Sequence, residues 1–212
     1  PIDCSRIVAL GDSGTFGWEV SDSQAYPQQL REILSSKYQS RKFDVINAGV
    51  PGYTSLQGLR LMRSHVMAFR PDVVLICFGG NDGDLLPVAD KDRHLRAWVL
   101  SLQSGLLRSR VYQLLYKLLI ADRFVSRASS HYNWVPRVAL EDFETNIHEM
   151  IRLAQRNGVG VVLMVRRGGP NESAYAYVLE KISRQANLPF DKEGIIGHPS
   201  AEGYRRVALR VA

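Results

Sequence analysis

Residues 71–82 read PDVVLICFGGND and contain the most apolar run of the chain. Pro71 opens the stretch, and two glycines, Asn81 and Asp82 close it. A short, continuous apolar run bounded by turn residues is typical of a buried strand in a parallel sheet. The stretch therefore predicts a buried strand that ends in a polar turn.

Apolar runs and helical patterns alternate along the rest of the chain. Further strands are predicted at 5–13, 43–52 and 159–165, with a short fifth strand at 188–190. Helical spacing of apolar residues predicts helices at 25–38, 55–69, 140–158, 172–186 and 200–211. This alternation indicates an α/β fold, with a parallel sheet of about five strands and helices on both of its faces.

Residues 83–138 interrupt the alternation and are too many for an ordinary loop. Leu107, Val111, Leu114 and Leu118 follow helical spacing, so we expect a helical insertion within a single domain that covers residues 1–212. Two interpretations stay open. The insertion could dock its apolar face on the core, or it could form a cap that lines an acyl or aryl pocket.

Composition excludes several classes of function. The chain has 212 residues, 45% of them apolar, and a net charge of +6. Its basic residues, Arg166 among them, are scattered, so solvated surface charge is expected and nucleic-acid binding is not. No apolar stretch is long enough to cross a membrane.

The sequence leaves location and assembly open. It begins at Pro1 rather than at a methionine, which indicates a processed or trimmed product and leaves open a removed signal or anchor segment. The expectation is a soluble domain, cytoplasmic or exported, of undetermined oligomeric state. Cys77 lies in the apolar run and is expected to be a buried small side chain.

Four polar or flexible residues lie where ligands bind in a parallel sheet, at or just past the carboxyl ends of the strands. They are Ser13, Gly49, Asn81 and, before the last predicted helix, His198. A serine needs an imidazole to take its proton, and a tetrahedral oxyanion needs fixed N–H donors. Each residue alone would be an ordinary turn or cap residue, but together they predict acyl transfer.

Other sites are not indicated. The G-x-S-x-G elbow fails because position 15 is threonine, and neither a Walker loop nor G-x-G-x-x-G is present. The remaining histidines lack the spacing of metal ligands. We therefore expect no metal and no organic cofactor, and a small-molecule ester as the partner.

These residues resemble the SGNH hydrolases, also called GDSL esterases and lipases. The four sequence blocks of that family are similar to GDSGTFG, NAGVPGYTS, GGND and HPSAEGY in this chain. The resemblance implies a flavodoxin-like three-layer α/β/α fold and ester hydrolysis through an acyl-enzyme. It also implies Ser13 as nucleophile, His198 as base, and the Ser13 and Gly49 amides with the Asn81 side chain as oxyanion donors.

One position departs from the family pattern. An aspartate normally precedes the histidine by three residues, and Ile195 stands there instead. Asp191 or Glu193 could orient the imidazole, or a backbone carbonyl could hold it in a Ser–His dyad. Alternatively, the segment from Phe190 to His198 is abnormally short and lacks a stretch that carried the aspartate.

The function therefore has alternatives. The main hypothesis is an ester hydrolase that acts on a small acyl ester, an acetylated glycan or a lipid. An O-acetyltransferase to a sugar would use the same site residues. A binding module that has lost catalysis is motivated by Ile195.

Overall fold

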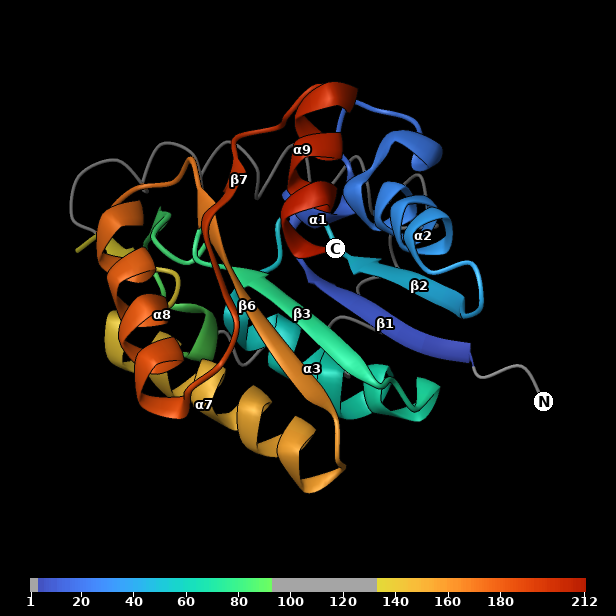
Figure 1. The fold of residues 1–212 in the computed structure, drawn as a ribbon. Coiled ribbons are helices and arrows are strands. Elements are labelled where there is room, and N and C mark those ends of the chain that lie inside the picture. The colour runs from blue at the N-terminus through green and yellow to red at the C-terminus, as the bar shows by residue number, and fades with distance from the viewer. Residues whose placement is uncertain (1–3, 93–132) are drawn as a thin grey trace, which may run out of the picture.

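Five parallel strands form the main sheet of the computed structural model, which describes residues 4–92 and 133–212 (Figure 1). Their order is β2-β1-β3-β6-β7. The strands are β1 (Cys4–Gly11), β2 (Lys42–Gly49), β3 (Val73–Phe78), β6 (Gly160–Arg167) and β7 (Phe190–Ile196). Counted in chain order this is the flavodoxin-like arrangement, whose ligand site lies between the first and third strands. The predicted α/β fold is confirmed.

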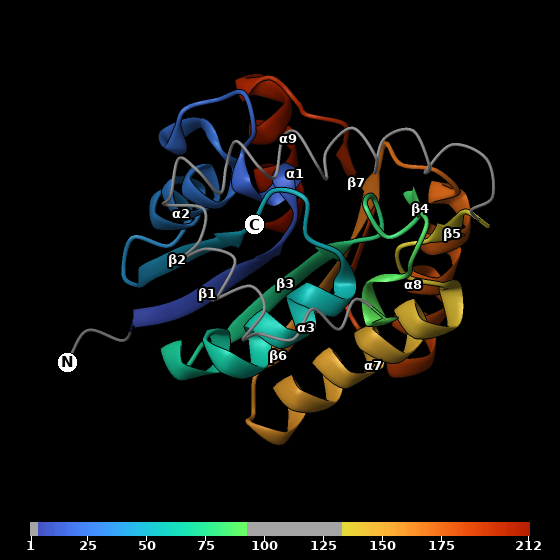
Figure 2. The ribbon, with the colours of Figure 1, turned by 180° about the vertical axis from the view of Figure 1, so that it is seen from behind.

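Helices cover both faces of the sheet, as Figures 1 and 2 show from opposite sides. On one face lie α1 (Ser13–Phe16), α2 (Tyr26–Lys37) and α9 (Ala201–Val211). On the other lie α3 (Ser55–Ser64), α7 (Leu140–Arg156) and α8 (Glu172–Ala186). Short 3-10 helices are η1 (Asp22–Gln24), η2 (Val66–Phe69) and η3 (Asp90–Asp92).

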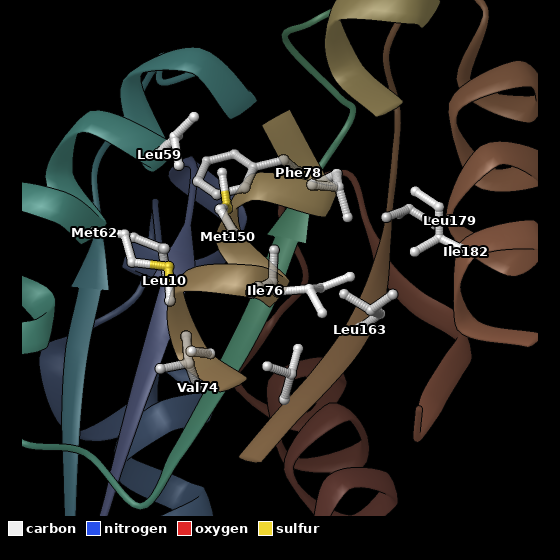
Figure 3. Packing of buried hydrophobic residues seen from close by; sticks show 14 of the residues in the cluster. Leu10, Leu59, Met62, Val74, Ile76, Phe78, Met150, Leu163, Leu179 and Ile182 are labelled. Atoms are coloured by element: carbon white, nitrogen blue, oxygen red, sulfur yellow. The ribbon is translucent and has the colours of Figure 1, made fainter. Parts of the chain in front are cut away.

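The central strand β3 is buried on both faces, which explains its unbroken apolar sequence. Val74, Ile76 and Phe78 point to the α3, α7 and α8 face, where Figure 3 shows Phe78 beside Leu59 and Met150. Leu75 and Cys77 face the α2 and α9 side. Each large apolar side chain buried in this way stabilises the fold by about 1.5–3 kcal/mol. Cys77 is fully buried, as expected, and burial raises the pKa of its thiol.

The edge strand β7 differs from its prediction. The expected strand at 188–190 was too short and too early, because β7 starts at Phe190 and continues to Ile196. Its residues 191–194 read DKEG, so the apolar pattern that marks the other strands is missing. Similarly, the predicted helix 55–69 ends at Ser64 and continues as the 3-10 helix η2.

A two-stranded antiparallel ribbon closes the predicted insertion at its base. β4 (Leu85–Leu86) pairs with β5 (Val135–Pro136). The Arg137 and Val138 N–H groups donate to the Asp84 and Asp82 carbonyls at 2.8 and 3.0 Å. Both ends of the insertion are thereby attached to the turn that follows β3. The predicted helical content at 93–132 lies outside the described residues.

In the part of the chain that the structure describes, no helix has the length and apolar character required to span a membrane.

Gly58 on α3 offers a test of how tightly this core is packed. A Cβ at position 58 would lie 2.5 Å from Cε2 and 3.0 Å from Cε1 of the Phe78 ring. Helix propensity alone would make Gly58→Ala stabilising by about 1 kcal/mol, whereas overpacking costs about 1–3 kcal/mol. We expect the variant to be less stable in urea denaturation. Exposed Arg60→Ala on the same helix is the control, and equal stability of the two variants would contradict the packing argument.

Candidate active site

Ser13 lies at the start of α1, directly after β1 and the buried Asp12. The Asp12 side chain caps the helix, because its Oδ1 accepts from the Gly14 N–H at 2.8 Å. The turn leaves the Ser13 side chain half-buried. Among the described residues, no hydrogen bond is formed by the Ser13 N–H. This amide is therefore available to an oxyanion.

His198 reaches Ser13 from the opposite end of the chain. Its Nε2 lies 2.9 Å from Ser13 Oγ, although 185 positions separate the two residues in the sequence. This distance is within the range for proton transfer between a nucleophile and its base. For Nε2 to accept the hydroxyl proton, the neutral ring must carry its own proton on Nδ1. The predicted pair is thus brought together at one edge of the sheet.

A bulge in β7 precedes His198. Met164 pairs with Asp191, but the next pair is Arg166 with Ile195, so β7 uses four steps where β6 uses two. Gly194 takes a φ of +63° within the bulge, a conformation that favours glycine. Bulges near active sites commonly redirect the chain that follows. The bulge precedes Gly197, also at positive φ, and then His198.

No acidic side chain of the described residues orients His198. Ile195 is fully buried among apolar residues of the α2 and α9 face. Both Asp191 carboxylate oxygens accept from Arg210 at 3.0 and 3.1 Å, and Glu193 lies 3.3 Å from the same guanidinium. Within these residues His198 Nδ1 also has no hydrogen bond to a backbone carbonyl. The two acidic candidates from the sequence therefore belong to an ion-pair cluster with α9.

Asn81 lies in the turn after β3 and contacts Asp12, the residue before Ser13. Its Nδ2 donates to the Tyr53 carbonyl at 2.9 Å and to Asp12 Oδ2 at 3.4 Å. The second contact is long, and Asp12 already has shorter bonds to other donors. One amide hydrogen of Asn81 is thus weakly held and close to the serine turn.

Gly49, the other predicted backbone donor, already has a hydrogen-bond acceptor in this structure. Its N–H donates to Asn47 Oδ1 at 3.0 Å, so it is not free to bind an oxyanion in this structure. A Cβ here would collide with the backbone of Phe16, which explains why glycine fits where β2 passes α1. The predicted oxyanion role of Gly49 would require the bond to Asn47 to be exchanged for one to the oxyanion.

Gly52, three residues further on, fits the donor role better. It lies in the exposed turn between β2 and α3, with a φ of +77°. Its N–H makes no hydrogen bond within the described residues, and a Cβ there would meet nothing. The next residue, Tyr53, provides the carbonyl that binds Asn81. In the sequence, Gly52 is the second glycine of NAGVPG, and the prediction considered only the first.

The site matches a known family. The sequence model of the GDSL-like Lipase/Acylhydrolase family matches residues 9–206, a span that contains Ser13, Asn81 and His198. The chain belongs to this family. The resemblance inferred from the four sequence blocks is therefore confirmed.

Similar proteins support the assignment of fold and family. The chain is 40% identical over 77 residues to thioesterase 1/protease 1/lysophospholipase L1 of Escherichia coli K12, a match that covers 36% of this chain and 35% of that protein. The chain thus matches about a third of this curated relative's length. It superposes on the lipase/acylhydrolase from Enterococcus faecalis with a TM-score of 0.62 and 19% identity, covering 98% of this chain and 93% of the other.

A further solved structure is a catalytic serine-to-alanine mutant of Axe2, an acetylxylan esterase from Geobacillus stearothermophilus. Its TM-score is 0.62 at 16% identity, with coverage of 100% of this chain and 94% of the other. At such identities the two superpositions establish the fold alone.

In this member of the GDSL-like family, Arg166 is buried, whereas the sequence analysis predicted a solvated surface charge. Its side chain is only 6% exposed, and its Nε lies 2.8 and 3.0 Å from the two oxygens of Asp12. The sequence offered a weak signal, since Arg166 directly follows the apolar run of a buried strand. Because a buried charge is rarely tolerated without a partner, the ion pair accounts for its position.

Asp82 holds the GGND turn against α3. It is fully buried, and its Oδ1 accepts from the Ser55 N–H and hydroxyl at 2.9 and 2.6 Å. Its Oδ2 accepts from the Gly79 N–H at 3.0 Å. Burial, only partly offset by these donors, raises the pKa of Asp82 to about 6. This carboxylate fixes the backbone beside Asn81.

The raised pKa of Asp82 predicts a pH dependence of stability. Folded Asp82 binds its proton more tightly than the unfolded chain, whose pKa is near 3.8. The resulting stabilisation is complete below 3.8 and is lost as the pH rises through about 6. In urea denaturation, wild type should therefore gain up to about 3 kcal/mol over Asp82→Asn between about pH 8 and about pH 4. Exposed Asp22→Asn is the control, and identical pH slopes for wild type and Asp82→Asn would contradict the assignment.

Proposed function

We propose that this chain is a serine esterase that hydrolyses a small acyl ester, an acetylated glycan or a lipid through an acyl-enzyme. The observation that carries the proposal is the 2.9 Å contact between Ser13 Oγ and His198 Nε2 at the carboxyl edge of the sheet. The contact joins a nucleophile to a base, which is the minimum for covalent acyl transfer. Membership in the GDSL-like family supports the same chemistry.

The reaction would proceed in two halves. Ser13 Oγ attacks the acyl carbonyl while His198 Nε2 takes the hydroxyl proton, and the tetrahedral intermediate collapses as His198 returns that proton to the leaving alcohol. Water then attacks the acyl-serine, with His198 again taking the proton. Collapse of the second intermediate breaks the bond between the acyl carbon and Ser13 Oγ, releases the carboxylic acid and returns the proton from His198 to Ser13 Oγ. The steps need no metal and no organic cofactor.

The oxyanion would be stabilised by three donors. We assign the Ser13 N–H and the Gly52 N–H, which have no acceptor in the described part of the chain, together with Asn81 Nδ2. Asn81 would exchange its long 3.4 Å contact to Asp12 for the oxyanion and keep its bond to Tyr53. Asp12 would remain satisfied by Arg166 and Gly14.

The catalytic unit would be a Ser–His dyad. Ile195 is buried, and Asp191 and Glu193 are held by Arg210, so no carboxylate is at hand for the imidazole within the described residues. In the best-studied serine triad, loss of the orienting acid lowers kcat by about 10⁴-fold without abolishing catalysis. The same feature motivates the alternative of a binding module that has lost its activity.

The names of the similar proteins support an acyl compound as the substrate. One is named a thioesterase and lysophospholipase, and another is an acetylxylan esterase. All these reactions proceed at an acyl carbonyl and differ in the acyl and leaving groups. An O-acetyltransferase would share the first half-reaction and replace water by a sugar hydroxyl in the second.

Replacing either member of the dyad tests the proposal. Ser13→Ala and His198→Ala should each lower kcat for p-nitrophenyl acetate by about 10³-fold or more, because proton transfer and nucleophilic attack depend on one another. Exposed Ser23→Ala and His65→Ala are the matched controls and should retain wild-type rates. A wild-type rate equal to that of Ser13→Ala would leave the binding module as the answer.

Asn81→Ala tests the oxyanion assignment. The variant should lower kcat by about 10²–10³-fold with little change in KM, because the donor acts mainly on the charge of the transition state. Asn157→Ala, at the exposed end of α7, should behave as wild type. A raised KM with unchanged kcat would remove Asn81 from the oxyanion site.

A further inference from the structure

Arg166 joins three of the chain segments that meet at the proposed active site. Its Nε binds both oxygens of Asp12, the residue before Ser13. Its Nη1 lies 3.3 Å from the carbonyl oxygen of Ile195, three residues before His198, and also donates to the Arg167 carbonyl. The guanidinium therefore connects the segment that carries the nucleophile to the segment that carries the base.

Close packing fixes the Arg166 side chain in this position. A Cβ at Gly14 would lie 2.7 Å from Arg166 Nε, and a Cβ at Gly80 would lie 3.0 Å from its Cγ. These glycines are the neighbours of Ser13 and Asn81 in the sequence. The arginine thus touches the serine, asparagine and histidine segments together, and nothing larger than glycine fits at either neighbouring position without displacement.

The Arg166 guanidinium binds the backbone at position 195, where the buried isoleucine offers no carboxylate to orient the imidazole. A carboxylate three residues before the histidine would orient the imidazole directly, and none does so in the described residues. Instead, the backbone at Ile195 is held by a charge-assisted hydrogen bond from Arg166. The planar, rigid fork of an arginine can hold a carboxylate and a carbonyl at a fixed separation.

We propose that Arg166 is a positioning residue for catalysis: it holds the His198 segment in register with Ser13 through Ile195 and Asp12, in place of an orienting acid. This inference rests on the proposed esterase function. Arg166 does not touch the reacting atoms, and it acts by keeping the contact between Ser13 Oγ and His198 Nε2 populated.

Arg166→Lys is the decisive variant. A lysine keeps a positive charge beside Asp12, so the buried carboxylate stays paired, but its single ammonium lacks the planar fork. Arg167→Lys is the matched control, because Arg167 is the next residue of β6 and its half-buried side chain lies 3.8 Å from Glu172 and donates to the Lys192 carbonyl at 3.2 Å, with no hydrogen bond to Asp12 or Ile195. The double variant Asp12→Asn with Arg166→Met, which leaves no buried charge unpaired, guards against a misfolded single variant.

Two measurements separate positioning from folding. The first is kcat and KM for p-nitrophenyl acetate. The second is covalent labelling by a fluorophosphonate, followed over time by intact mass, in which Ser13 Oγ bonds to phosphorus and fluoride departs. The labelling rate constant reports the geometry of the dyad, whereas the fraction of chains finally labelled reports how many are folded.

We expect Arg166→Lys to lower kcat and the labelling rate constant together, by up to about 10²-fold, since a displacement of about 1 Å in a catalytic group has that effect. KM should stay within about twofold, the labelled fraction should equal that of wild type, and Arg167→Lys should match wild type in every value. The double variant should label as slowly as Arg166→Lys.

Other outcomes would overturn the inference. A wild-type labelling rate constant in Arg166→Lys or in the double variant would show that Arg166 does not position the dyad, and a loss confined to the labelled fraction would show a purely structural role. If wild type itself is not labelled at Ser13, the proposed function fails and this inference fails with it.

Discussion

The carboxylate of Asp12 is the interaction on which the rest of the site depends. It is 1% exposed and accepts hydrogen bonds from Gly14, Asn81 and Arg166, which belong to three different segments. A buried charge of this kind is stable only when its donors are in place. The serine turn, the asparagine turn and the end of β6 therefore have to be ordered together.

Sequence patterns were sufficient to place three polar residues of the candidate site at one edge of the sheet. Ser13, Asn81 and His198 could be placed because each follows a predicted strand or precedes a predicted helix, and parallel strands end at one edge. Gly49 could not be separated from Gly52, because only the structure shows which N–H is already bonded to Asn47. Arg166 was misjudged because charge alone suggests solvent, whereas its partner is 154 positions away.

The last strand shows a different limit of sequence patterns. β7 lies at the sheet edge, and its DKEG stretch forms a bulge rather than an alternating ladder, so no periodic signal marks it. The bulge precedes the turn to His198, while Ile195 joins the core. Ile195 therefore packs its side chain into the core, while its carbonyl oxygen lies 3.3 Å from Arg166 Nη1.

The β4–β5 ribbon has a consequence for how the chain between its two strands is attached. It joins Leu85–Leu86 to Val135–Pro136, and the two residues after the second strand donate hydrogen bonds to the turn after β3. Leu86 and Val135, where the intervening chain leaves and returns, are thereby held side by side. The entropic cost of closing a flexible loop grows with the number of residues between its ends, and here the ribbon itself sets the distance between those ends. The scaffold thus fixes the two attachment points independently of whatever chain connects them.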